Sequence, residues 1–298
     1  MRIIPNLFEI PASKSLDSSA AIVNVASVPK LSPFRYPGGK TWLIPEIRSW
    51  LKGLRQKPGI FIEPFAGGGI ASLIVAFENL ASKIIMGELD ENVAAVWKVI
   101  LQDADWLINR ILTFEISLVK VQEILSSSPS CLREKAFQTV LRNRVQRGGI
   151  MAPGASLMKS GENGKGISSR WYAKTLAKRI QDIYRKRDTI TFIQGDAFDL
   201  IGDYLNDDTV AFFIDPPYTA GGKRAGKRLY LYNEINHNNL FLQMARARGE
   251  FLMTYDDAEE VEKMALENCF CIKRVPMKNT HHNRLFELLI TPNRHLII

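Results

Sequence analysis

The sequence lacks several patterns that mark common protein classes. No apolar run approaches the ~20 residues that a membrane-spanning helix needs, and the N-terminus carries Arg2 without the apolar core of a signal peptide. The three cysteines, Cys131, Cys269 and Cys271, form no CxxC pair, and the four histidines have no Cys/His metal spacing. These absences predict a reducing, cytoplasmic protein with no metal and no membrane partner.

The chain does have an uneven charge. It contains 298 residues, of which 46% are hydrophobic and 23% charged, an ordinary soluble composition with enough length for a large core. Residues 131–187 hold 14 Lys/Arg against 3 Asp/Glu, and residues 219–233 hold 4 Lys/Arg and no acid. Because the net charge of the whole chain is only +8, the remainder is acidic. Two basic segments on an acidic body favour a polyanionic partner such as nucleic acid, against the alternative of solvated helix faces.

Strand patterns alternate with helical patterns along most of the chain. Residues 59–80 and 83–101 each predict a strand, a turn and a helix, and residues 105–187 are mostly helical in pattern. Further strands are predicted at 189–198, 210–218, 250–256, 270–279 and 285–291. The alternation predicts a mainly parallel sheet with helices on both faces. The short link between the last two strands predicts a hairpin, and therefore an antiparallel edge.

Two helix starts carry capping signals. Asp90 precedes the helical pattern ENVAAVW and is the residue type favoured at an N-cap. Asp256 is followed three residues later by Glu259, which predicts a capping box for the helix after residues 250–256.

Acidic residues stand where four of the predicted strands end: Glu63, Glu88, Asp196 and Asp215. Ligands of such sheets bind beyond these C-terminal ends. Glu88 follows Gly67 at the distance where nucleoside-binding folds place an acid for ribose hydroxyls.

Three consecutive glycines, 67–69, follow the first strand and permit close approach of a ligand to the backbone, with a tight strand–helix turn as the alternative. No phosphate-binding GK[ST] motif follows them. A site lined with acids repels a triphosphate, but it tolerates a ligand that bears an amine and a sulfonium. S-adenosylmethionine is such a ligand.

The stretch DPPY, Asp215 to Tyr218, combines groups suited to methylating an exocyclic amine. The amine of adenine is a poor nucleophile, so a carboxylate and a backbone carbonyl that accept its N–H groups stabilise the charge that develops on nitrogen. Pro216 and Pro217 stiffen the turn that holds these carbonyls. Tyr218 offers a ring on which a base stacks.

Three motifs in order, FRYPGGK at 34–40, FIEPFAGGG at 61–69 and DPPY at 215–218, resemble those of the Dam-like DNA adenine methyltransferases. The resemblance covers about residues 34–290. It implies a class I methyltransferase fold, Rossmann-like, with an inserted target-recognition region. It also implies base flipping, S-adenosylmethionine as cofactor and double-stranded DNA as partner, and it leaves open a restriction or defence partner and the oligomeric state.

The resemblance divides the chain into an N-terminal arm at 1–32, a catalytic domain at 33–100 and 188–298, and a recognition region at 101–187. It implies a catalytic tetrad of Asp215, Pro216, Pro217 and Tyr218. It assigns the cofactor to Tyr36, Lys40, Phe65, Ala66, Gly67, Gly69, Glu88, Asp196, Phe198 and Asp215. The expected DNA contacts are Arg142, Arg144 and Arg147 in the recognition region, and Lys223, Arg224, Lys227 and Arg228 after DPPY.

The recognition region matches the family's GATC-reading motif only loosely, so that specificity is not carried over. The roles of the arm 1–32 and of His281 and His282 stay open. Cytosine-amino DNA methyltransferases, which more often have Ser before the prolines, and RNA adenine methyltransferases are the alternatives. Protein-glutamine methyltransferases usually have Asn at that position, and the non-enzymatic alternative is an inactive DNA-binding subunit.

Overall fold

The computed structural model describes residues 28–35, 39–151, 155–159, 161, 164–217, 235–278 and 284–292. Within these residues the chain forms one seven-stranded sheet. Its strands are β1 (Ile60–Glu63), β2 (Lys83–Glu88), β3 (Ile190–Gln194), β4 (Val210–Ile214), β5 (Glu250–Asp256), β6 (Cys271–Lys278) and β7 (Arg284–Thr291). Residues 1–27 of the predicted arm 1–32 and the whole basic segment 219–233 belong to the residues that are not described.

The strand order is β3-β2-β1-β4-β5-β7-β6. Strands β1 to β5 pair in parallel, whereas β7 is antiparallel to both β5 and β6. The predicted hairpin is therefore confirmed, and its second strand is inserted between β5 and β6 rather than added at the edge. The chain runs outward from β1 to β3 and then returns to β4 on the other side of β1, which makes the β1–β4 boundary the switch point where such sheets bind ligands.

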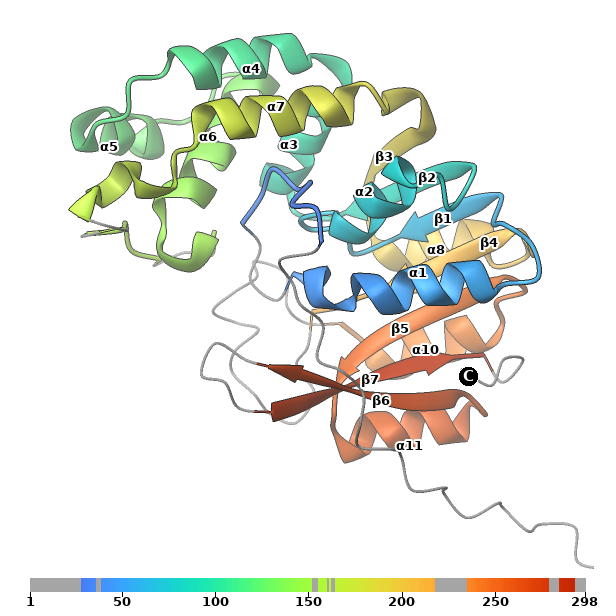
Figure 1. Cartoon of the computed structure of the whole chain (residues 1–298). Coiled ribbons are helices and arrows are strands. Elements are labelled where there is room, and N and C mark those ends of the chain that lie inside the picture. The colour runs from blue at the N-terminus through green and yellow to red at the C-terminus, as the bar shows by residue number, and fades with distance from the viewer. Residues whose placement is uncertain are drawn as a thin grey trace, which may run out of the picture.

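Helices cover both faces of the sheet (Figure 1), with an apolar core under each layer of helices. Because side chains alternate along a strand, Ala211 and Phe213 of β4 belong to one core and Phe212 and Ile214 to the other. The first core packs under α1 (Ile44–Gly53), α2 (Ile70–Phe77) and α3 (Glu91–Gln102). The second packs under α8 (Ala197–Tyr204), α10 (His237–Ala245) and α11 (Glu259–Glu267).

A group of helices lies between α3 and β3 in the chain, and Figure 1 shows it beyond the β3 end of the sheet. Its members are α4 (Ala104–Thr113), α5 (Leu118–Ser126), α6 (Leu132–Val145) and α7 (Ala173–Tyr184). This is the mostly helical insertion that the sequence predicts. Its buried residues, such as Leu107, Phe137 and Ile180, join the same core that covers the first face of the sheet. The insertion is therefore packed onto the sheet domain through a shared apolar core.

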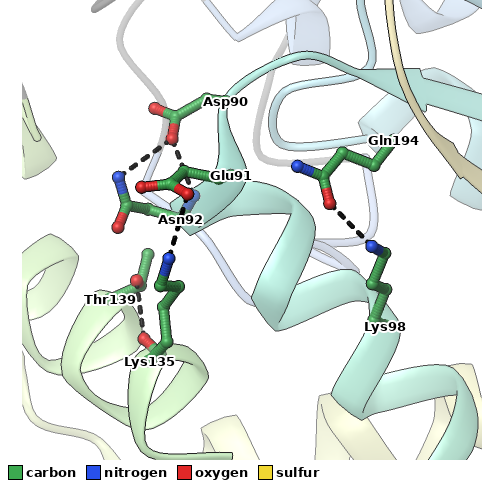
Figure 2. A network of polar contacts seen from close by, with 7 residues as sticks. All are labelled: Asp90, Glu91, Asn92, Lys98, Lys135, Thr139 and Gln194. Carbon is green, nitrogen blue, oxygen red and sulfur yellow. Dashed lines mark hydrogen bonds and ion pairs between the residues drawn. The ribbon is translucent and has the colours of Figure 1, made fainter. Parts of the chain in front are cut away.

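The start of α3 confirms one of the two capping predictions (Figure 2). The carboxylate of Asp90 accepts the backbone N–H of Asn92 at 2.8 Å. The next residue, Glu91, pairs with Lys135 of α6 at 3.0 Å, so the same helix end contacts the insertion. The other capping prediction is wrong. Asp256 ends β5, where it pairs with Glu287 of β7, and Ala258 is the N-cap of α11.

Candidate active site

The glycine turn after β1 is fixed by hydrogen bonds from several elements. Glu88, at the end of β2, accepts the backbone N–H of Gly67 at 2.9 Å with one carboxylate oxygen and that of Asp90 at 2.9 Å with the other. The indole N–H of Trp97 on α3 donates to the carbonyl of Gly67 at 2.9 Å. The hydroxyl of Ser32 donates to the carbonyl of Gly68 at 2.6 Å. The turn is thus rigid before any ligand binds.

Gly69 is required by packing inside the protein. Its φ is +63°, a left-handed conformation that glycine adopts at little cost. A Cβ at this position would lie 2.4 Å from the methyl carbon of Met86 and 2.8 Å from the ring of Trp97. This glycine therefore allows α2 to begin directly against β2 and α3, and its own contacts do not indicate a ligand.

Asp215 follows β4, next to the end of β1 and therefore at the switch point. Its Oδ1 accepts the hydroxyl proton of Thr254 on β5 at 2.9 Å. The same oxygen lies 3.2 Å from Nζ of Lys40, in the short helical turn Lys40–Leu43 before α1. A hydroxyl and an ammonium on one oxygen orient the carboxylate, which is only partly buried.

Lys40 bridges two carboxylates. Its Nζ lies 3.1 Å from Oε1 of Glu287 on β7, and the lysine is only 4% exposed. Burial lowers the pKa of Lys40, but the charges of Asp215 and Glu287 outweigh burial and hold it above its usual value. Burial raises the pKa of Glu287 to about 7, with the ammonium of Lys40 acting in the opposite direction. We call Lys40, Asp215 and Glu287 the acid–lysine group.

Two further acids stand at neighbouring strand ends, and one of them, the buried Glu63, interacts electrostatically with Asp215. Glu63, the last residue of β1, accepts the backbone N–H of Ser72 at 2.9 Å. Burial raises the pKa of Glu63 to about 8, against the hydrogen bonds from Ser72, and the carboxylates of Asp215 and Glu88 raise it further. Burial likewise raises the pKa of Glu88 to about 7, against backbone hydrogen bonds that lower it. The strand ends thus gather more negative groups than Lys40 balances.

The other residues expected at the cofactor line the same edge or fall outside the described residues. Ala66 is buried, and its N–H donates to the carbonyl of Gly87 at 2.8 Å. Phe65 and Phe198 are half-buried against the second core. Asp196 caps α8 by accepting the N–H of Phe198 at 2.7 Å. Tyr36 and Tyr218 lie outside the described residues.

The expected DNA contacts separate in the structure. Arg147 is exposed and Arg142 is half-buried. Arg144 is only 5% exposed and donates to the backbone carbonyl of Pro33. The segment before Lys40 therefore packs over Arg144, and a DNA contact at this residue stays a prediction. Lys223, Arg224, Lys227 and Arg228, and also His281 and His282, lie outside the described residues.

Sequence reasoning missed two groups that contact the acid–lysine group or its neighbours. Glu287 is a single acid within an apolar strand, and that isolation is a signal of burial with a partner. His237 Nδ1 lies 3.0 Å from the hydroxyl of Tyr255. Burial raises the pKa of Tyr255, as does the charge of Asp215.

Among the described residues, no cluster of His, Cys, Asp and Glu has the arrangement of a metal site, and no helix is long and apolar enough to cross a membrane.

The donor set fits S-adenosylmethionine better than a phosphate-bearing nucleotide. Glu63, Glu88 and Asp215 supply carboxylates at adjoining strand ends, and the pKa values of Glu63 and Glu88 are raised, mainly by burial and further by the negative charge of neighbouring carboxylates. A ligand with a sulfonium and an amine relieves this crowding, whereas a triphosphate increases it. Each oxygen of Glu88 accepts one N–H and has a second lone pair, so it can also accept a hydroxyl proton.

Comparison with known proteins finds a matching family model and a similar curated protein. Residues 36–128 match the model of the D12 class N6 adenine-specific DNA methyltransferases. The Type II methyltransferase M.MjaIII of Methanocaldococcus jannaschii is 21% identical over 294 residues, covering 88% of this chain and 99% of that protein.

Two solved structures of methyltransferases are also similar. The rRNA methyltransferase aviRa from Streptomyces viridochromogenes gives a TM-score of 0.42 at 15% identity, covering 87% of each chain. A putative RNA methyltransferase from Pyrococcus horikoshii gives 0.37 at 11% identity, covering 90% of this chain and 92% of that one. At these scores neither structure bears on the substrate.

Proposed function

We infer that this chain, whose residues 36–128 match the D12 class N6 adenine-specific DNA methyltransferases, transfers a methyl group from S-adenosylmethionine to the exocyclic amine of adenine in DNA. The observation that carries the assignment of a reacting centre is the carboxylate of Asp215, oriented by Thr254 and Lys40 at the switch point of the sheet. We further propose the roles that individual residues play.

Asp215 accepts one N–H of the adenine amine in this proposal. As nitrogen attacks a methyl group it gains positive charge, and a fixed carboxylate stabilises that charge without having to reorganise. A backbone carbonyl of the Asp215–Pro217 stretch accepts the second N–H, and proline holds this stretch stiff. Because the amine is paired and stacked inside a duplex, the base must first be flipped out, at a cost of a few kcal/mol. We propose that Tyr218 offsets part of this cost by stacking.

Lys40 and Glu287 act through Asp215. Lys40 holds one oxygen of Asp215 in place, and Glu287 takes a share of the ammonium, so that Lys40 does not fully neutralise Asp215. A carboxylate paired with an undivided ammonium would be a weaker acceptor for the amine. We therefore assign Glu287 as a positioning residue and not as a catalytic one.

The cofactor site lies at the ends of β1 and β2. S-adenosylmethionine supplies, when bound, an electrophilic methyl group on a sulfonium. Glu88 would accept the ribose hydroxyls, and the turn Gly67–Gly69 would lie along the methionine part. Phe65, Ala66, Asp196 and Phe198, from the neighbouring turns, and Lys40 complete the proposed site. Tyr36, which is outside the described residues, stays a proposed cofactor contact on the resemblance alone. The acids around the site neutralise the cationic ligand.

The helices between α3 and β3 form the DNA-recognition part of the proposal, at residues 101–187, attached to a catalytic domain of 33–100 and 188–298. The excess of basic residues in 131–187 supports this division. Arg142 and Arg147 remain proposed phosphate contacts there, and Lys223, Arg224, Lys227 and Arg228 are proposed as phosphate contacts after DPPY.

A methyl-transfer assay with nucleoside analysis tests the function. Unmethylated duplex DNA of mixed sequence is incubated with the full chain and S-adenosylmethionine, digested, and analysed by mass spectrometry. We expect N6-methyl-2′-deoxyadenosine among the released nucleosides. N4-methylcytosine as the product, or methylation of single-stranded RNA in preference to duplex DNA, would overturn the assignment. Binding of S-adenosylmethionine without any product would indicate an inactive subunit or a different acceptor.

A further inference from the structure

Four arginines gather where the helical insertion meets the segment before Lys40. They are Arg35 in that segment, Arg144 on α6, Arg170 at the end of the short helix Gly166–Arg170, and Arg179 on α7. We call them the arginine cluster. They come from four separate parts of the chain, so only the fold brings them together.

Backbone carbonyls take up part of the hydrogen-bonding capacity of the cluster. Arg179 donates from Nη1 to the carbonyl of Ser32 at 3.0 Å, and Arg144 donates from Nη2 to the carbonyl of the next residue, Pro33. Asn143 holds the backbone of Arg35 from both sides, accepting its N–H at 2.8 Å and donating to its carbonyl at 2.8 Å. The guanidinium groups are thus built into the structure and are not loose surface chains.

Two guanidinium nitrogens in the cluster are buried without a hydrogen-bond partner among the described residues: Nη1 of Arg35 and Nε of Arg144. Among the described residues, no carboxylate forms an ion pair with Arg35, Arg144 or Arg179. A buried donor of a charged group without an acceptor is costly, and native proteins usually satisfy it with a partner or a ligand. The missing groups are acceptors that carry negative charge.

The electrostatics support the same conclusion. Burial lowers the pKa of Arg144 to about 10, and the positive charges of Arg179, Arg35 and Arg170 lower it further. Burial also lowers the pKa of Arg35, together with the charge of Arg170. Like charges that disfavour one another are stabilised when an anion binds between them.

We propose that the arginine cluster binds one phosphodiester group of the DNA substrate. Guanidinium groups match a tetrahedral oxyanion through paired N–H donors, and a phosphodiester supplies both the acceptors and the negative charge that the cluster lacks. The chemistry would also admit free phosphate or sulfate. Duplex DNA is favoured because three of the four arginines belong to the segment 131–187, which holds 14 Lys/Arg against 3 Asp/Glu. This proposal rests on DNA being the substrate.

A phosphate bound by the arginine cluster would also affect the turn Gly67–Gly69 that we assign to the cofactor. Ser32, whose carbonyl accepts from Arg179, donates from its hydroxyl to the carbonyl of Gly68. The residues that hold the cluster therefore also hold the turn that we assign to S-adenosylmethionine. A phosphate in the cluster would fix this segment on both sides.

The test compares Arg179→Gln with Lys178→Gln in the full chain. The two residues are neighbours on α7 and lose the same charge, but Lys178 is 75% exposed and pairs with Asp182 of its own helix. Fluorescence anisotropy of a labelled duplex is measured at several salt concentrations. Lys178→Gln should bind within about 2-fold of the unaltered chain. Arg179→Gln should bind about 10-fold more weakly and lower the salt slope by about 0.9, the value for one phosphate contact.

Three controls keep the outcomes separate. Thermal melting without DNA shows whether Arg179→Gln folds; Arg35→Gln, read in the same assays, replaces it if it does not. Arg179→Lys should restore the salt slope and only part of the affinity, because lysine keeps the charge without the paired donors. Thermal stabilisation by sodium sulfate is compared with sodium chloride at equal ionic strength.

If Arg179→Gln binds DNA with unchanged affinity and salt slope and adenine is still methylated, phosphate binding by the arginine cluster is overturned. The proposed function is then left intact. Stabilisation by sulfate without any change in DNA binding would overturn the phosphodiester and leave a free anion as the ligand. If the variants lose DNA binding but the unaltered chain makes no methyladenine, the cluster stands and the proposed function fails.

Discussion

The arginine cluster and the acid–lysine group each include one residue of the short segment 32–40, and the two groups carry opposite net charges. Arg35, near the start of residues 32–40, belongs to the arginine cluster, and Lys40, at their end, belongs to the acid–lysine group. In the first, arginines gather with unpartnered nitrogens. In the second, Lys40 is shared between Asp215 and Glu287, with Glu63 and Glu88 nearby.

The difference shows how each group relates to its proposed ligand. Neither group is balanced by the chain alone, and the missing charge is positive at the strand ends and negative beside the insertion. A sulfonium with an amine supplies the first, and a phosphodiester supplies the second. We therefore expect single substitutions in the acid–lysine group and its neighbours to affect the cofactor or the chemistry while leaving phosphate binding unchanged.

Among the substitutions that test this comparison, removal of the Asp215 carboxylate should have the largest effect, and the effect should be on turnover. Asp215→Ala should reduce turnover by ~10²–10⁴-fold, because the carboxylate stabilises charge that develops only in the transition state. Cofactor binding should stay within a few-fold, and DNA binding should keep its salt slope. Steady-state kinetics and calorimetric titration with S-adenosylmethionine measure the first two.

The matched control for Asp215→Ala is Asp208→Ala, just before the N-terminal end of β4, at a side chain that is 68% exposed. It should leave turnover within about 2-fold. Near-normal turnover in Asp215→Ala would remove this residue from the reacting centre.

Removing Glu88 should weaken the cofactor and leave the chemistry of bound substrate intact. Glu88→Ala loses the proposed ribose contacts and also the acceptors for the N–H groups of Gly67 and Asp90. We expect a loss of about 1–3 kcal/mol in binding of S-adenosylmethionine, measured by calorimetric titration. Glu88→Gln keeps the shape and should lose less. An unchanged dissociation constant in both variants would exclude Glu88 from the cofactor site.

The elements with local signals could be predicted from the sequence. Apolar runs bounded by turns predict the parallel strands, and Asp90 is predictable as an N-cap because the backbone N–H that its carboxylate accepts is only two residues away. Asp256 was mispredicted because its local capping pattern competes with a strand pair, Asp256 with Glu287, that is invisible in the local sequence. Tertiary pairing therefore overrode a valid local signal.

Contacts between distant residues account for what could not be predicted in the site. Glu287 reaches Lys40 across 247 residues, and only because β7 is inserted between β5 and β6. Arg144 looks like a DNA contact in the sequence, since it lies among basic residues. In the fold its guanidinium donates to the carbonyl of Pro33, 111 residues away. Neither partner is marked by composition or spacing.

Neutralising Glu287 should have a moderate effect that separates positioning from catalysis. In Glu287→Gln the ammonium of Lys40 is left mainly to Asp215, so we expect about a 10-fold loss of turnover with cofactor affinity nearly unchanged. Because glutamine cannot ionise, a rise of turnover through the pKa of Glu287, about 7, should disappear from the pH profile of the variant. Glu267→Gln, on the exposed side of α11, is the control. A lower melting temperature with unchanged turnover and pH profile would make Glu287 a purely structural residue.

The smallest effect should appear in the pH dependence of stability. The pKa of Glu63 is raised from 4.5 to about 8, so the folded state favours its neutral form. The stability that this preference contributes is fully present below about pH 4.5 and is lost as pH rises through about 8. Glu63→Gln cannot ionise, and it should therefore flatten the fall of unfolding free energy over this range, by at most ~1.4 kcal/mol per pH unit, the slope for one proton.

Glu88 and Glu287 have pKa values raised to about 7, so the slope should decrease in Glu63→Gln without vanishing. Urea unfolding at several pH values measures it, with Glu123→Gln, an exposed residue of α5, as the control. S-adenosylmethionine should flatten the slope of the unaltered chain in the same way, because a cation at the strand ends stabilises the ionised carboxylates. A slope that is identical in Glu63→Gln and in the unaltered chain would mean that Glu63 is already ionised in the folded protein. The strand ends would then tolerate their negative charge without a cationic ligand, and the contrast with the arginine cluster would be lost.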